Sequence, residues 1–146
     1  MMRQGYCARL AMLCCLLAGC TTSFGPVLQP VTGPANQPTL HWASFPSPQD
    51  LEDDPQGKLK EAHTITYELR VFTADRRIVY QRSAVREPEH QLNWGLESGK
   101  TYYWTVRPHF EIEGKPRVGH WSTIHCPDVF SWTRPLPLSA FASFRT

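Results

Sequence analysis

Alternation of hydrophobic and polar residues is the dominant pattern of this chain. It is clearest over residues 63–72, where one face takes Ile65, Tyr67, Leu69 and Val71 and the other takes Thr64, Thr66, Glu68 and Arg70. A period of two, with β-branched and aromatic residues, predicts a half-buried β-strand. Similar but shorter patterns predict strands over residues 39–45, 78–82, 90–94, 101–107 and 109–112. In segment 90–94, Leu92 is the expected inward residue.

Turn-forming residues separate these segments, for example over residues 73–77, 87–89 and 113–116. A last strand is expected between Thr123 and Trp132. No segment of ten or more residues after Cys20 shows the period of a helix. Hydrophobic residues make up 41% of the chain, which is enough for a core and excludes a chain that is disordered throughout. The pattern therefore predicts one all-β domain, a sandwich or a barrel.

The first twenty residues have the organisation of an export signal. Arg3 and Arg9 are the only charges before a short apolar run over residues 10–18, and small residues follow. The run is too short for a permanent membrane-spanning helix. Its end, Leu17-Ala18-Gly19-Cys20, resembles the lipobox of bacterial lipoproteins.

That resemblance implies a signal peptide over residues 1–19, cleavage before Cys20, and acylation of Cys20 by palmitate-type chains. Two or more acyl chains would anchor the mature protein stably in a membrane. Thr21, in place of an aspartate, favours the outer membrane, with the domain facing the periplasm. The alternative is an ordinary signal peptide in which Cys20 is incidental.

Removal of the signal changes the composition. Cleavage removes 19 of the 146 residues, including Arg3 and Arg9, and leaves 13 of the 15 basic residues against all 13 acidic ones. This balance gives no indication of a nucleic-acid partner. Three cysteines leave with the signal, so with Cys20 acylated only Cys126 is free. A disulfide framework is excluded, and Cys126 is expected to be a buried apolar residue, with an intermolecular disulfide as the alternative.

Four short motifs are similar to those of fibronectin type III domains. They are Pro38-x-Leu40-x-Trp42, Tyr67-x-Leu69-x-Val71, Leu96-x-x-Gly99-x-x-Tyr102-x-Trp104-x-Val106 and Gly119-x-Trp121-Ser122. The resemblance implies an immunoglobulin-like antiparallel β-sandwich over residues 38–133, with Trp42 in its core. It also implies a tyrosine corner, in which Tyr102 hydrogen-bonds backbone near Leu96. A transthyretin-like sandwich is the competing topology.

The segments on either side of this region are assigned from composition. Residues 20–37 contain prolines at every fourth position from Pro26 and are predicted to be a lipid-anchored, Pro-rich tether. Within it, Val27, Leu28 and Val31 are candidates for a first edge strand. Residues 134–146 form a C-terminal tail that has no counterpart in the family.

No catalytic or metal-binding motif stands out. His120 and His125 are five residues apart beside Cys126, and this spacing puts two strand side chains on opposite faces. The acids Asp50, Glu52, Asp53 and Asp54 match no calcium loop and are better explained as a solvated charge run. We expect no catalytic residue, no metal and no cofactor.

Aromatic residues are the remaining candidates for binding. Trp94, Trp121 and Trp132, if exposed on one face, would stack on sugar rings or anchor a protein partner; otherwise Trp121 and Trp132 cap the ends of the sandwich. Tyr103, Thr105 and Arg107 share the outer face of their strand. Together with Glu68 and Arg70 they form either a binding face or a solvated one.

The sequence therefore predicts a lipid-anchored, non-catalytic binding or assembly module of the bacterial cell envelope. Its partners would be the membrane, through the lipid on Cys20, and an envelope protein, with strand addition at an exposed sheet edge as one mode. The first alternative is a carbohydrate- or peptidoglycan-binding module that uses exposed tryptophans. The second is a metal-dependent enzyme that uses His120, His125 or Cys126.

Overall fold

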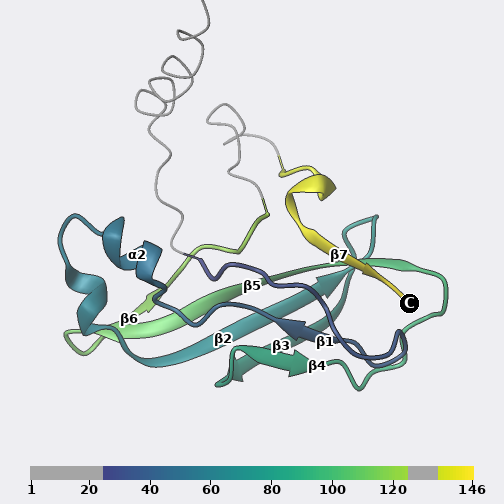
Figure 1. Ribbon diagram of the computed structural model, residues 1–146, viewed down its shortest axis with the longest axis horizontal. Coiled ribbons are helices and arrows are strands. Elements are labelled where there is room, and N and C mark those ends of the chain that lie inside the picture. Colours follow the sequence, from purple (N-terminus) through teal and green to yellow (C-terminus); the bar gives the residue numbers. More distant parts are fainter. Residues whose placement is uncertain (1–24, 125–134) are drawn as a thin grey trace, which may run out of the picture.

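A computed structural model describes residues 25–124 and 135–146 of the chain. Its regular structure is mainly strand: β1 (Thr39–His41), β2 (His63–Phe72), β3 (Ile78–Val85), β4 (Glu89–Gln91), β5 (Thr101–Ile112), β6 (Lys115–Val118) and β7 (Ala142–Arg145). The helices are short: α2 (Pro48–Glu52), η1 (Lys58–Glu61) and η3 (Leu138–Ala140). The predicted all-β class is confirmed (Figure 1).

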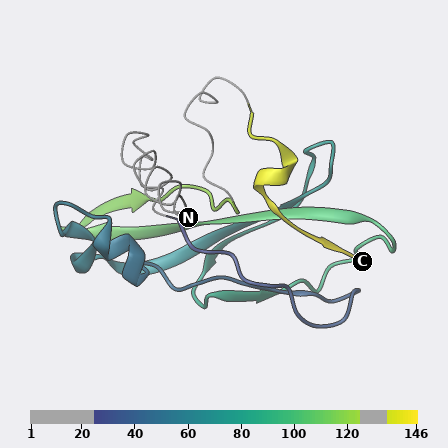
Figure 2. The ribbon, with the colours of Figure 1, turned by 45° about the horizontal axis from the view of Figure 1, so that its top comes forward.

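The strands form two antiparallel sheets that pack as a sandwich. The larger sheet has the order β3-β2-β5-β6, with β7 also paired to β5, and the smaller sheet pairs β1 with β4. The long strands β2 and β5 run side by side from His63↔Glu111 to Phe72↔Tyr103. Figure 2 separates the layers, with β4 and the N-terminal segment on one side and β5 on the other.

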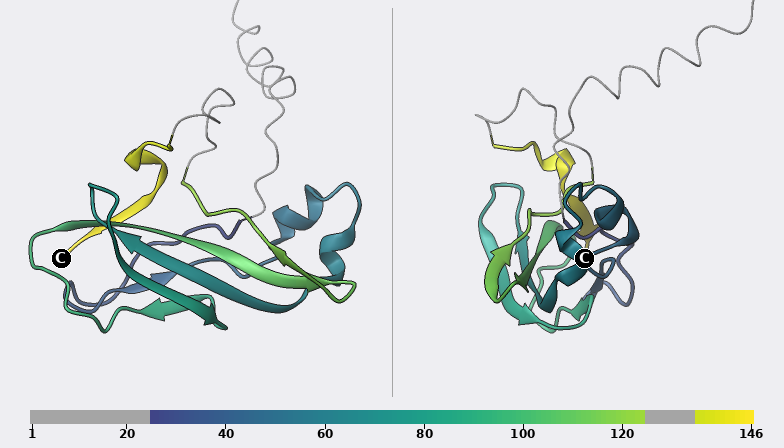
Figure 3. Two further views of the ribbon diagram at one scale, coloured as in Figure 1. Left: turned by 180° about the vertical axis from the view of Figure 1, so that it is seen from behind. Right: turned by 90° about the vertical axis from the view of Figure 1, so that its left-hand side faces the viewer.

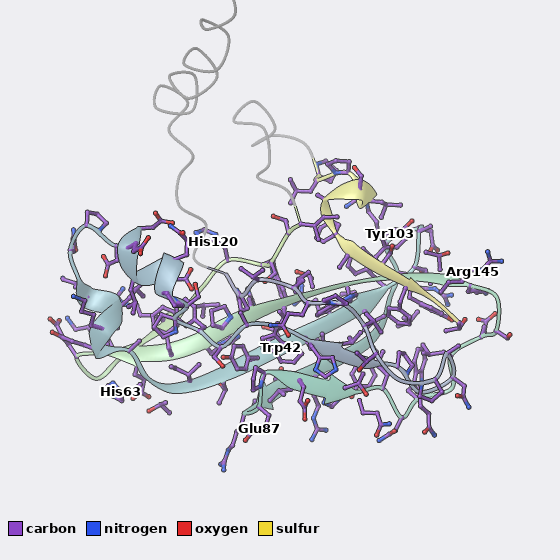
Figure 4. The ribbon with its side chains drawn as sticks, viewed as in Figure 1. Trp42, His63, Glu87, Tyr103, His120 and Arg145 are labelled. Carbon is purple, nitrogen blue, oxygen red and sulfur yellow. The ribbon has the colours of Figure 1, made fainter. Side chains whose placement is uncertain are left out.

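The core lies between the two sheets. It is formed by the inward faces of the predicted strands, including Leu40, Trp42, Leu69, Leu92 and Trp104, which are 0–2% exposed. The rings of Trp42 and Trp104 lie 6.4 Å apart. Figure 4 shows Trp42 inside the molecule and His63 and His120 at its periphery. The inward orientation predicted for Trp42 and Leu92 is confirmed.

The hydrogen bond predicted for Tyr102 is also present. Its buried hydroxyl accepts a hydrogen bond from the backbone N–H of Glu97, at 3.0 Å, one residue after Leu96. This bond ties the loop before β5 to the strand itself. A second buried tyrosine, Tyr67, accepts from the backbone N–H of Phe45 at 2.9 Å and so ties β2 to the segment that follows β1.

Residues 25–37 pack against the sandwich. The carbonyl of Val27 accepts from the N–H of Ala43 at 2.8 Å, and two isolated bridges pair Leu28 with Trp42 and Thr32 with Thr39. Pro26 is fully buried. The predicted first edge strand is thus a pair of bridges beside β1, and the folded unit begins before Pro38. Within the predicted tether, only residues 20–24 lie outside the described part of the chain.

The C-terminal residues contribute a strand where the sequence indicates only a tail. β6 pairs with one end of β5 (Val118↔His109) and β7 with the other (Ala142↔Trp104). Between them the N–H of Ser122 donates to the carbonyl of Val106 at 2.8 Å. β6 and β7, which are far apart in the sequence, therefore both pair with β5, and Figure 3 shows β7 beside one end of β5. Most of the last strand predicted within Thr123–Trp132 falls in residues 125–134, which are outside the described residues.

The acidic loop contains a helix that the sequence analysis did not predict. α2 lies at the end of the molecule opposite the C-terminus (Figure 1). Ser47 and Asp50 form a capping box: each side chain accepts a hydrogen bond from the other residue's backbone N–H, at 3.2 and 2.7 Å. Asp54 accepts from the backbone N–H of Leu59 at 2.7 Å, and this bond holds its pKa below the ordinary value. Two of the four clustered acids, Asp50 and Asp54, thus accept hydrogen bonds from backbone N–H groups.

Candidate functional site

The outer face of the larger sheet carries a charged cluster that we call the Glu68 cluster. Its members are Glu68 and Arg70 of β2, Gln81 of β3, Arg107 and His109 of β5, and Trp121 after β6. Alternation puts the strand residues on one face, and the register places Glu68 opposite Arg107. The Glu68 side chain is only 7% exposed, whereas the arginines keep about a third of their surface (32% for Arg70 and 27% for Arg107).

Every acceptor direction of the Glu68 carboxylate is occupied. Its Oε2 accepts from Nε and Nη2 of Arg107, at 2.8 and 2.7 Å, and contacts Nε2 of His109 at 3.1 Å. Its Oε1 accepts from Nη2 of Arg70 at 3.1 Å and from Nε2 of Gln81 at 2.9 Å. The cluster therefore ties together the three strands β2, β3 and β5.

These contacts determine the charge of Glu68. Burial alone would raise its pKa, but hydrogen bonds from Arg107 and His109 and the charges of Arg107 and Arg70 outweigh burial and hold the pKa below its ordinary value. The carboxylate is thus ionised at neutral pH and has no free lone pair for a proton. A residue in this state holds strands together and is not poised as a general acid or base.

Trp121 packs on the two arginines of the cluster. The Cζ atoms of Arg70 and Arg107 each lie 4.4 Å from its ring centroid, within the range of a cation–π contact. The next residue holds the indole in place, since the carbonyl of Ser122 accepts from Oγ1 of Thr105 at 2.7 Å. Trp121 therefore lies against the outer face and does not cap an end of the sandwich. Its ring is half-buried and engaged by protein.

Tyr103 and Thr105, the other predicted members of the polar face, do not join the Glu68 cluster. Thr105 is buried beneath the Trp121 segment. Tyr103 stacks on Phe72 at 5.9 Å, and Phe141 packs edge-on against Phe72 at 5.0 Å. The predicted face is thus divided into a charged part and an aromatic part.

A second surface lies on the open side of the sandwich, between β3 and β4. We call it the β3–β4 surface and define it by Arg77, Ile78, Tyr80, Arg82, His90 and Trp94. Tyr80 stacks on His90 and lies tilted against Trp94, with centroid distances of 5.7 and 6.3 Å, and its hydroxyl lies 2.6 Å from Nε2 of His90. Burial lowers the pKa of His90, and the charge of Arg82 lowers it further.

A hollow of about 300 Å³ opens beside this stack. It is lined by Thr73, Arg77, Ile78, Val79, Trp94, Gly95, Glu97 and Tyr102. Trp94 and Ile78 are two of the five large hydrophobic residues that the described chain exposes, at 39% and 48%. Sequence analysis singled out Trp94 but not Ile78 or Tyr80, because distant segments create the hollow.

The two edges of the larger sheet differ. β3 has eight residues and pairs only with β2 among the described residues. It contains no proline, and register shifts interrupt its pairing at two places. β6 has four residues, all exposed, and includes Pro116, which cannot donate a backbone hydrogen bond. β3 is therefore the longer free edge with more backbone donors.

Several predicted site residues lie outside the described residues: Cys20, His125, Cys126 and Trp132. Within residues 25–124 and 135–146, no three His, Cys, Asp or Glu side chains gather closely enough to hold a metal ion. The same ranges contain no helix of sufficient length and apolarity to cross a membrane.

Comparison with known proteins gave no match: no protein-family model fits the chain, and no curated protein matches it. The evidence for the sandwich fold is the strand pairing and the buried core of the chain itself.

Proposed function

We infer that this protein is a non-catalytic binding or assembly module of the bacterial cell envelope, and that it engages a protein partner through the edge of β3. The observation that carries this proposal is the eight-residue edge, which is unpaired on its outer side among the described residues. Extended peptides add to such edges through main-chain hydrogen bonds.

The state of the other polar surface supports the same conclusion. In the Glu68 cluster the carboxylate, both guanidinium groups and the indole already contact one another. A ligand there would have to break charge-assisted contacts before it made any of its own. The edge of β3 requires no such exchange, because its outer backbone groups are bonded to no described residue.

The lipobox-like sequence that ends at Cys20 supports attachment to the outer membrane. Lipid at this position would hold the sandwich close to the membrane, facing the periplasm. Confinement to one surface raises the effective concentration of the domain toward partners on that surface. An anchored module of this kind would stabilise or organise a larger envelope assembly.

The proposal is tested by crosslinking and pull-down from native membranes, with the full protein and a Cys20→Ala variant. We expect a discrete protein partner with the acylated protein and its loss with the variant. Recovery of no protein partner by either form would contradict the proposal. The domain itself should be equally folded in both, which circular dichroism would check.

The exposed indole of Trp94 beside a hollow favours one other candidate, a glycan- or peptidoglycan-binding module. Indole rings stack on sugar rings, and the hollow has polar groups on its rim. The same pull-down distinguishes the two candidates. Glycan fragments without protein, lost in Trp94→Ala, would favour the glycan.

A further inference from the structure

We propose that the β3–β4 surface binds an extended, acidic segment of a partner protein, with one apolar side chain of that segment seated in the hollow beside Trp94. This inference rests on the proposed function and names the chemistry of the partner. Three features of the surface carry it: its arginines, the exposed apolar side chains of Ile78 and Trp94 at the hollow, and the form of its edge.

Arginines outnumber acids along β3 and the turns at its ends. Residues 74–89 contain four arginines and three acids, Asp75, Glu87 and Glu89, and Glu89 already faces His41 at 3.4 Å. Arg76 and Arg77 have local partners, since Arg76 donates to the carbonyl of Leu136 and Arg77 acts on Asp75. Arg82 and Arg86 form no ion pair or hydrogen bond with any described residue. An acidic partner would supply the missing counter-charges.

The hollow gives this surface a place for one specific side chain. Ile78 and Trp94 line it with exposed apolar side chains, and Tyr80 packs against the indole at 6.3 Å. Glu97 on its rim is already paired with Lys100. Ile78 belongs both to the hollow and to the free edge, so a strand added to β3 would pass beside the hollow. Pockets of this kind give strand addition its specificity, while backbone bonds give affinity.

The form of the edge disfavours a second copy of this chain as the occupant. Pairing two β3 edges would bring Arg82 and Arg86 of one copy close to those of the other. The bulges opposite Tyr67–Leu69 and Val71–Phe72 also limit the regular ladder to a short central part. Bulges and edge charges are devices that suppress unspecific pairing. A short acidic segment is compatible with both features.

The test is a titration of the full chain in detergent micelles, followed by amide chemical shifts. The probes are a short peptide that alternates glutamate and threonine around one leucine, its lysine-for-glutamate counterpart, and a version with serine in place of leucine. We expect the acidic peptide to shift the amide resonances of β3, and we expect added salt to weaken its binding. The double variant Arg82→Glu/Arg86→Glu should lose about tenfold in affinity and prefer the lysine peptide. Lys115→Glu/Arg117→Glu on β6 is the matched control and should bind as the wild type.

Trp94→Ala distinguishes the contribution of the leucine side chain in the hollow from that of the charges. It should reduce binding of the leucine peptide about tenfold, or about 1.4 kcal/mol, and leave the weaker serine peptide unchanged. The inference is overturned if no acidic peptide shifts β3, if charge reversal on β3 has no more effect than on β6, or if the serine and leucine peptides bind equally. Self-association, vesicle binding or glycan binding at this surface would overturn it too. If the membrane pull-down still yields a partner in that case, the inference fails while the proposed function stands.

Discussion

Substitution of Glu68 by glutamine should destabilise the protein strongly, although the side chain keeps its shape. The carboxylate, 7% exposed, neutralises Arg70 and Arg107 and accepts five contacts shorter than 3.2 Å. Glutamine removes the charge and turns an NH2 group toward groups that are themselves donors. The two guanidinium groups, packed on Trp121, then lose their counter-charge.

The magnitude follows from burial. Breaking a buried ion pair by removing one partner costs about 3–5 kcal/mol. Here the arginines are about a third exposed and regain water, so we expect a smaller cost than for a fully buried pair, about 2–3 kcal/mol. For a domain of this size the melting temperature should fall by about 10 °C.

Chemical denaturation of wild type and Glu68→Gln measures this difference, with Glu111→Gln as the control. Glu111 lies on β5 beside His63 at 3.5 Å, but both side chains are exposed and the pair should contribute less than about 1 kcal/mol. If the two variants lose the same free energy of unfolding, the structural role assigned to Glu68 is refuted.

Three further predictions concern stability. Because the pKa of Glu68 is lowered on folding, the stability difference between wild type and Glu68→Gln should be complete above the ordinary pKa of 4.5 and shrink as the pH falls below it. Denaturation at a series of pH values from about 3 to about 7 measures this. Tyr102→Phe should lose about 1 kcal/mol, through the bond to Glu97, whereas Tyr103→Phe should be unchanged in urea denaturation. Gly25→Ala should lose about 1–3 kcal/mol, because a Cβ would lie 2.9 Å from the His120 carbonyl oxygen; Gly95→Ala, which meets no atom within 4 Å, should keep the wild-type melting temperature.

The sequence predicted the elements whose pattern is local. Alternation over residues 63–72 and 101–107 located β2 and β5 and assigned their inward faces, because one buried face imposes a period of two. The spacing from Leu96 to Tyr102 predicted a hydrogen bond that the structure contains. These features depend on neighbours in sequence and one buried layer.

The features that were missed depend on pairing between distant segments or on very short signals. β7 has only four residues and becomes a strand because the exposed edge of β5 is available to it. Pro26 appears tether-like in sequence, but it is buried and its carbonyl accepts a hydrogen bond from the hydroxyl of Ser122, nearly a hundred residues later. The helix α2 had a signal, Ser47 and Pro48 followed by Asp50, which is a capping box with proline in the first turn.

The candidate sites show the same division. The grouping of Glu68, Arg70 and Arg107 on one face was predicted, since strand parity determines it. Whether this face was free or occupied was left open, because Trp121 reaches it from a segment after β6. The hollow beside Trp94 combines the β2–β3 hairpin with the loop before β5, and no local pattern joins these segments.

Site-specific photocrosslinking in cells tests the central claim most directly. A photoreactive residue would be placed at Ser83 on the edge of β3 and, as the control, at Arg117 on β6. The account predicts a crosslink to one discrete envelope protein from position 83, lost when Arg82 and Arg86 are replaced by glutamate, and none from position 117. Crosslinks of equal strength from both positions, or a product from position 83 that survives the charge reversal, would contradict it.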